Sequence, residues 1–94
     1  MKYYNLMNIS MSQLVVFHSA ATLKNFTKTA DQLAITQPTV SKSISALEQE
    51  LGVSLFIRSK NHRLELTPAG EILYEHCSSL IPDLYQVFNR IQIV

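Results

Sequence analysis

Apolar residues recur at three- or four-residue intervals in the first half of the chain and predict three successive helices. Ser10 and the glutamine three positions later form a capping-box pattern, so a first helix is expected over about 11–23. Thr27 can cap a second, short helix that continues to about Leu33. A tight turn follows. A left-handed Ala34 there would cost about 1 to 2 kcal/mol, which leaves the dihedral angles of the turn open.

The third predicted helix has one apolar face and one polar face. Thr36 can cap its open amides, Pro38 suits its first turn, and Gly52 can end it in a left-handed conformation. The apolar stripe consists of Val40, Ile44, Leu47 and Leu51. The opposite side presents Pro38, Lys42, Ser45 and Gln49, flanked by Thr39 and Ser41. This polar side is the first candidate binding surface.

The period of the pattern changes after the third helix. Two short strands are predicted around 55–57 and 64–66, joined by the polar segment SKNHR, in which Asn61 is expected to take a positive φ. Thr67 and the proline after it predict the start of a long amphipathic helix over about 68–94. This order of elements predicts a mainly α fold, a winged helix-turn-helix with three helices and a two-stranded wing, followed by a long C-terminal linker helix.

The last helix carries an apolar seam whose members are spaced alternately four and three residues apart. Its first part can pack on the core, whereas its distal part extends beyond a body of this size, so a second copy of the chain is the expected partner. The alternative is that the whole seam docks within its own chain. Pro82 lacks the N–H that a helix interior uses, and a kink or break is predicted over 79–82. The candidate dimerisation positions are Leu73, Cys77, Leu80, Leu84, Tyr85, Val87, Phe88 and Ile91.

Composition fits one small domain, because 47% of the 94 residues are hydrophobic and 16% are charged. We assign 1–9 to a short extension rather than a signal peptide, 10–67 to the winged helix-turn-helix and 68–94 to the linker helix. The single cysteine cannot form an internal disulfide, and no stretch is long and apolar enough for a membrane span. A reducing cytoplasm is therefore the expected location, with no membrane partner.

Charge is distributed unevenly along the chain. The net charge of +1 argues weakly against a nucleic-acid binder, but six basic residues lie between Lys24 and Arg63 against three acidic ones. From charge alone, an ordinary mixed surface is the simpler interpretation. The three histidines are far apart in the sequence and the chain has only two glycines. No zinc-like set and no phosphate-binding glycine loop emerges, so we expect no catalysis, no metal and no cofactor.

The start of the third predicted helix has the chemistry that a DNA major groove accepts. Gln37 can offer a donor and an acceptor to adenine, Pro38 and Thr39 can meet a thymine methyl group, and Lys42 can reach guanine or a phosphate. Short hydroxyls that suit phosphate oxygens are Thr36, Ser41, Ser43 and Ser45. Each has a plainer interpretation, as a helix cap or a solvated side chain. The rival function is a winged-helix module for protein association, in which the same helix docks on a protein.

Three stretches resemble the N-terminal domain of LysR-type transcriptional regulators: QLVVF at 13–17, NFTKTADQLAITQPTVSKSISALEQELGVSLFIR at 25–58 and LTPAGEILYEH at 66–76. The resemblance implies a bacterial domain that binds double-stranded DNA, with the third helix in the major groove and the wing on the backbone or in the minor groove. It also implies a homodimer on an interrupted palindrome, paired through the linker helix. A small-molecule effector would act only through a C-terminal domain outside this sequence, and a tetramer stays open for the full-length protein.

By position, the resemblance assigns DNA contacts to the start of the third helix, to Arg58 at the start of the wing, and to Lys28 near the start of the second helix. Lys42 stands where many members have arginine, which replaces a planar two-pronged donor with a point charge. The wing also lacks the glycines often seen in the family. The candidate DNA-binding set is Lys28, Thr36, Gln37, Pro38, Thr39, Ser41, Lys42, Ser45, Arg58, Lys60 and Arg63.

Overall fold

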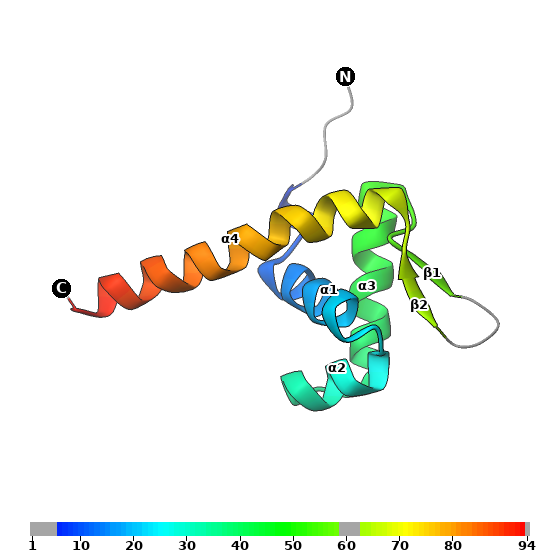
Figure 1. Ribbon diagram of the computed structural model, residues 1–94, viewed down its shortest axis with the longest axis horizontal. Helices are drawn as coiled ribbons and strands as arrows, with labels where there is room; N and C mark the ends of the chain where they lie inside the picture. Colours follow the sequence, from blue (N-terminus) through cyan, green and yellow to red (C-terminus); the bar gives the residue numbers. More distant parts are fainter. Residues whose placement is uncertain (1–5, 59–62, 94) are drawn as a thin grey trace, which may run out of the picture.

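The computed structural model describes residues 6–58 and 63–93 and has the predicted winged helix-turn-helix architecture. Its elements are a 3-10 turn at Leu6–Asn8, α1 (Met11–Leu23), α2 (Phe26–Leu33), α3 (Gln37–Leu51), β1 (Phe56–Arg58), β2 (Leu64–Leu66) and α4 (Pro68–Ile93). Figure 1 shows α1 between α4 and α2, with α3 packed beside α1 and the wing next to the start of α4. The positive φ expected at Asn61 lies outside the described residues.

The capping residues of the first two helices follow the prediction at α1 and differ from it at α2. The Gln13 amide donates to Ser10 Oγ at 3.1 Å and the Ser10 amide donates to Gln13 Oε1 at 2.9 Å, which completes the predicted capping box. The cap of α2 is Asn25 rather than Thr27, because the side-chain oxygen of Asn25 accepts from the Lys28 amide at 2.8 Å. Asparagine is the stronger capping residue of the two, and α2 therefore begins earlier than predicted.

The turn between α2 and α3 is built on Ala34, which takes the left-handed conformation with φ 56° and ψ 42°. The Ile35 amide donates to the Ala30 carbonyl at 3.0 Å, which is the six-to-one bond of a Schellman motif. The question that the sequence left open is thereby resolved: the turn does place an alanine at a position that favours glycine.

The core lies where α3 meets α1 and the wing. The predicted apolar stripe of α3 is confirmed, with Val40, Ile44 and Leu47 buried. Phe17 of α1 is also fully buried, and its ring lies 5.3 Å from that of Phe56 on β1. Burial of several large side chains at one junction fixes the angle between these elements, since each contributes about 1.5 to 3 kcal/mol when it leaves water.

The wing is attached to the ends of two helices. Its strands pair antiparallel, with Phe56 opposite Leu66. Glu48, near the end of α3, accepts from the Leu55 amide at 2.7 Å through its carboxylate. The Leu55 carbonyl accepts in turn from the Thr67 amide at 3.0 Å. A Cβ atom on Gly70, in the first turn of α4, would collide with that same carbonyl oxygen, so glycine is required there for close approach.

The long helix α4 runs without interruption from Pro68 to Ile93, so of the kink or break predicted over 79–82 the break is wrong. Pro82 lies inside the helix and removes one bond to the carbonyl of Ser78. Both residues are exposed, so water can satisfy that carbonyl, and the packing of the preceding turns holds the helix in place. Figure 1 shows the distal half of α4 extending beyond the body formed by α1, α2 and α3.

We expect Ala34→Gly to raise the free energy of unfolding by roughly 0.5 to 1 kcal/mol, because relief of the left-handed strain exceeds the added entropy of the unfolded chain. The Ala34 side chain is exposed, so little packing is lost. Urea unfolding followed by circular dichroism measures the change. The control is Ala46→Gly inside α3, which is expected to lower the same free energy by about 1 kcal/mol. A loss of stability in Ala34→Gly would contradict the assignment of strain to this turn.

Candidate nucleic-acid interface

The first two turns of α3 present an exposed polar surface. Thr36 caps the helix, and the Thr39 amide donates to its Oγ1 atom at 3.4 Å. The side chains predicted to face outward do so, since Gln37, Pro38, Thr39, Lys42, Ser45 and Gln49 are exposed. Ser41 is half-buried at the border between the two faces. The predicted rotation of α3 about its axis is therefore confirmed.

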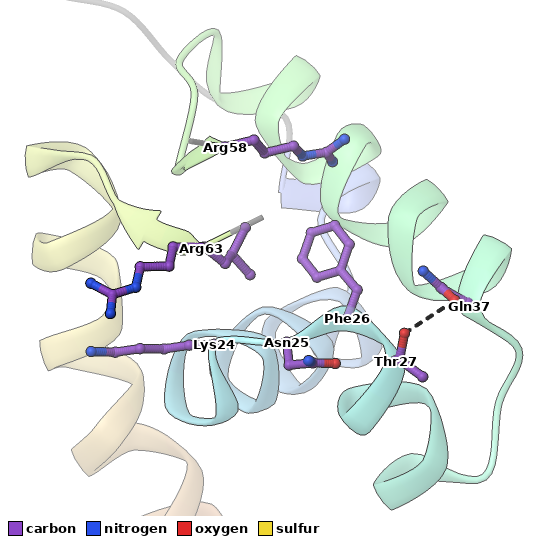
Figure 2. Close-up of a pocket in the computed structure, with 8 residues that line it drawn as sticks. Lys24, Asn25, Phe26, Thr27, Gln37, Arg58 and Arg63 are labelled. Carbon is purple, nitrogen blue, oxygen red and sulfur yellow. Dashed lines mark hydrogen bonds between the residues drawn. The ribbon is translucent and has the colours of Figure 1, made fainter. Parts of the chain in front are cut away.

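The start of α2 holds the start of α3 in place through one polar contact. The Thr27 hydroxyl donates to Oε1 of Gln37 at 3.3 Å. Figure 2 shows this bond and places the amide nitrogen of Gln37 on the side away from Thr27. The bond ties the carbonyl end of the amide to α2, so the donor end has a preferred direction. Thr27 was predicted to cap α2, and Asn25 takes that role and leaves the hydroxyl available for Gln37.

A hollow lies between the start of α2, the start of α3 and the wing. It has a volume of about 310 Å³, at the lower end for small-molecule sites, and its polar lining residues are exposed. Such an open hollow suits an extended polar chain better than an enclosed ligand. The lining residues that matter for its chemistry are Lys24, Phe26, Thr27, Gln37, Arg58 and Arg63.

Basic side chains from β1 and from the ends of α1 and β2 line this hollow. Figure 2 shows Arg58 extending from β1 toward α3, while Lys24 and Arg63 extend on the other side of the hollow. The guanidinium carbon of Arg58 lies over the ring of Phe26, 5.1 Å from its centroid. Lys28 is exposed on the first turn of α2. The candidate residue Lys60 lies outside the described residues.

Sequence reasoning missed three residues of this hollow. Lys24 was counted among the basic residues but was left out of the candidate DNA-binding set. Phe26 was not among the candidate residues, and Thr27 was taken only as the cap of the second helix. The signal that could have found them is Asn25, because an asparagine cap would have placed Phe26 and Thr27 in the first turn of α2, facing the wing and α3.

A second polar cluster joins α1 to α4. His18 is half-buried and its ring stacks on Tyr74, with the centroids 5.0 Å apart. The Ser78 hydroxyl donates to the Tyr74 carbonyl at 2.8 Å and has no second proton. Nε2 of His18 is therefore the donor in its 3.2 Å contact with Ser78 Oγ. Burial lowers the pKa of His18 below its usual value. The sequence placed His18 in no cluster with the other histidines, and in the structure it lies at this junction between α1 and α4.

The seam of α4 divides into an inner part and an outer part. Cys77 is fully buried within the chain and Leu73 packs against the core, so these two candidate dimerisation positions contribute to the packing of the chain itself. Burial also raises the pKa of the Cys77 thiol. Leu80 and Leu84 are half-buried. The exposed outer positions are Tyr85, Val87, Phe88 and Ile91, with exposed fractions of 68%, 38%, 56% and 59%.

Two further properties concern the described residues alone. Within 6–58 and 63–93, no group of three or more His, Cys, Asp or Glu side chains is arranged to hold a metal ion. Over the same part of the chain, none of the helices combines the length and apolar character needed to cross a lipid bilayer.

Comparison with known proteins identifies the family. The sequence model described as "Bacterial regulatory helix-turn-helix protein, lysR family" matches residues 11–71, which is more than half of the chain. The chain belongs to the LysR family. A relative of this LysR-family chain is the glycine cleavage system transcriptional activator homolog of Haemophilus influenzae, 40% identical over 81 residues that cover 86% of this chain and 27% of the relative. The chain spans less than a third of the length of the curated relatives that it matches.

Solved structures share the same fold. The BenM DNA-binding domain in complex with catB site 1 DNA superposes with a TM-score of 0.82 at 31% identity, covering 88% of this LysR-family chain and 91% of that one. The CbnR DNA-binding domain in complex with DNA gives a TM-score of 0.79 at 30% identity, covering 89% and 95%. The likeness includes the long C-terminal helix, since these alignments span most of both chains.

The His18 junction makes stability depend on pH. Because burial lowers the pKa of His18 in the folded chain, the unfolded chain takes up the proton first. We expect the contribution of His18 to the free energy of unfolding to be complete above about pH 6.5 and to decrease below it. Urea unfolding at about pH 7.5 and about pH 5.5 measures this decrease.

The matched variants are His18→Gln, which removes the junction's titrating group, and His76→Gln, which removes an exposed histidine from α4. The decrease in stability between the two pH values should shrink in the first variant and persist in the second. An equal decrease in wild type and His18→Gln would show that His18 is not its source.

Proposed function

We propose that this chain binds double-stranded DNA sequence-specifically, as the DNA-binding domain of a LysR-type transcriptional regulator. The observation that carries the proposal is the exposed polar face of α3, which starts beside a hollow lined by basic side chains. A DNA major groove accepts an α-helix, and side chains near the N-terminal end of that helix contact the base edges. The likeness to two domains whose structures were determined with DNA supports the same conclusion.

In the proposed complex, the side chains of α3 divide into readers and anchors. Gln37 reads adenine through its amide, Pro38 and Thr39 meet thymine methyl groups, and Lys42 contacts guanine or a phosphate. The hydroxyls of Thr36, Ser41 and Ser45 contact phosphate oxygens, which position the helix without specifying sequence. Lys28, Arg58, Lys60 and Arg63 contribute positive charge from α2 and the wing, and the wing lies on the backbone or in the minor groove.

The proposal extends to pairing through α4. The distal apolar side chains Tyr85, Phe88 and Ile91 are exposed, and Figure 1 shows their part of α4 beyond the rest of the chain. Exposed apolar positions at heptad-like spacing favour a second helix of the same kind. We therefore assign 10–67 to DNA binding, 68–94 to homodimerisation, and 1–9 to an extension. Two copies would place their α3 helices in successive major grooves of an interrupted palindrome.

The regulatory role of a longer protein follows as part of the proposal. The curated relatives are more than three times as long as the matched region. A C-terminal domain of that size would hold the small-molecule effector, and it could also join dimers into a tetramer. The family is one of transcriptional regulators, which points to a role other than catalysis.

The competing function is protein association through the same face of α3. Salt distinguishes the two functions, because neutralising several phosphates makes DNA affinity fall steeply with the logarithm of salt concentration. A protein interface depends on salt more weakly. Selection of duplexes from a random pool by the wild-type chain would supply the half-site and its spacing together. Failure to bind any duplex at low salt would refute the proposed function.

We expect Gln37→Ala to weaken binding to the selected duplex by about 1 to 3 kcal/mol and to relax base preference at one position. Lys28→Ala should weaken selected and random duplexes alike and lower the salt slope by about 1, because it removes a phosphate contact. Fluorescence anisotropy titrations over a salt series measure both effects. The matched control is Gln49→Ala, on the same face but at the far end of α3. An equal loss for selected and random duplexes in Gln37→Ala would contradict its role as a base reader.

The pairing proposal predicts that the wild-type chain sediments as a dimer and Leu84→Asp as a monomer, because a carboxylate in the seam would be buried without a partner. Sedimentation velocity measures both. Gln86→Asp introduces the same charge at an exposed position on the other side of α4 from Leu84. This variant should remain dimeric. If wild type and Leu84→Asp were both monomeric, pairing through α4 would be wrong for this chain.

A further inference from the structure

Arg58 is held by an aromatic ring rather than by a carboxylate. Its guanidinium carbon lies 5.1 Å from the centroid of Phe26, within the range of a cation–π contact. No carboxylate in the described ranges forms an ion pair with Arg58 that would compete with this arrangement. Figure 2 shows the side chain reaching from β1 over the ring toward α3, so the contact spans two elements that are distant in sequence.

The ring that supports Arg58 is itself fixed to the core. Phe26 meets Phe56 edge to face, with their centroids 5.9 Å apart and an interplanar angle of 82°. Phe56 is buried and contacts the fully buried Phe17 of α1. Three rings therefore connect the centre of the core to the rim of the hollow. A half-buried Phe26 anchored in this way offers Arg58 a surface in a defined place.

We propose that Phe26 is a positioning residue for Arg58, and that it holds the guanidinium at the rim of the hollow, ready to contact a DNA phosphate. This inference rests on the proposed DNA-binding function. Contact with a ring face forms no hydrogen bond to an oxygen, so the guanidinium keeps N–H donors for phosphate oxygens. The ring restricts a long side chain before binding, which lowers the entropy that is lost when the phosphate contact forms.

The inference separates the loss of a charge from the loss of its placement. Arg58→Ala removes a phosphate contact and should lower the salt slope by about 1. Phe26→Leu keeps an apolar side chain and leaves the charge in place, so the salt slope should not change. Its affinity for the selected duplex should nevertheless fall about fivefold, as expected for a contact of this kind. Phe26→Tyr keeps the ring and should restore the wild-type affinity.

A double-mutant cycle with Phe26→Leu and Arg58→Ala provides the decisive test. If Phe26 acts through Arg58, Phe26→Leu should weaken binding in the wild-type background and have little effect when Arg58 is already alanine. In the chain without DNA, the NMR signals of the Arg58 side chain should show a ring-current shift in wild type and Phe26→Tyr that is lost in Phe26→Leu. Circular dichroism confirms that each variant is folded.

Equal losses in the two backgrounds would show that Phe26 acts structurally, and the inference would be overturned. An unchanged affinity in Phe26→Leu would also overturn it, as would the absence of a ring-current shift in a folded wild-type chain. Absence of duplex binding by wild type at low salt would instead refute the proposed function itself. The NMR comparison needs no DNA, so it reports on the placement of Arg58 whichever way the binding experiment turns out.

Discussion

The burial of Val40, Ile44 and Leu47 fixes the rotation of α3 about its own axis, and the rest of the structure depends on that constraint. An α-helix turns about 100° per residue, so a stripe buried at these positions directs the polar side chains of the first two turns away from the core. Rotating α3 by one residue would bury hydroxyl groups without partners and expose leucine, and both changes are unfavourable. The same contacts that stabilise the fold therefore determine which surface meets a partner.

The short helix α2 links this surface to the wing through three consecutive residues. Asn25 caps the helix, Phe26 lies beneath Arg58 and contacts Phe56, and Thr27 donates to Gln37. Each residue performs one task, and together they bring a side chain of β1 and a side chain of α3 to the rim of one hollow. Neither α3 nor the wing would define that surface alone.

The amphipathic patterns were sufficient to predict the elements, and competition between neighbouring residues together with long-range contacts explains what they missed. The capping box at Ser10, the stripe of α3 and the hairpin followed from spacing, because burial and capping depend on near neighbours. Asn25 and Thr27 are both capping residues, and the stronger capping tendency of asparagine places the start of α2 at Phe26. The positions of His18 and Cys77 were also out of reach, because α4 lies against α1 across more than 50 residues of chain. The break at Pro82 was predicted from the free energy lost with one helix hydrogen bond, and water at the exposed Ser78 reduces that loss.

Close approach of the backbone at Gly70 makes the first turn of α4 rigid, so α4 can bend only farther along the helix. The first turn of α4 lies directly against the Leu55 carbonyl, and Thr67 bonds to the same strand entry. The first turn of α4 cannot act as a hinge without separating the wing from α3. The turn before Pro82 lacks one backbone bond, and Ser78, Ser79 and Pro82 are exposed. A force applied to the far end of α4 would therefore bend the helix near Pro82. The body formed by α2, α3 and the wing would move as one rigid unit.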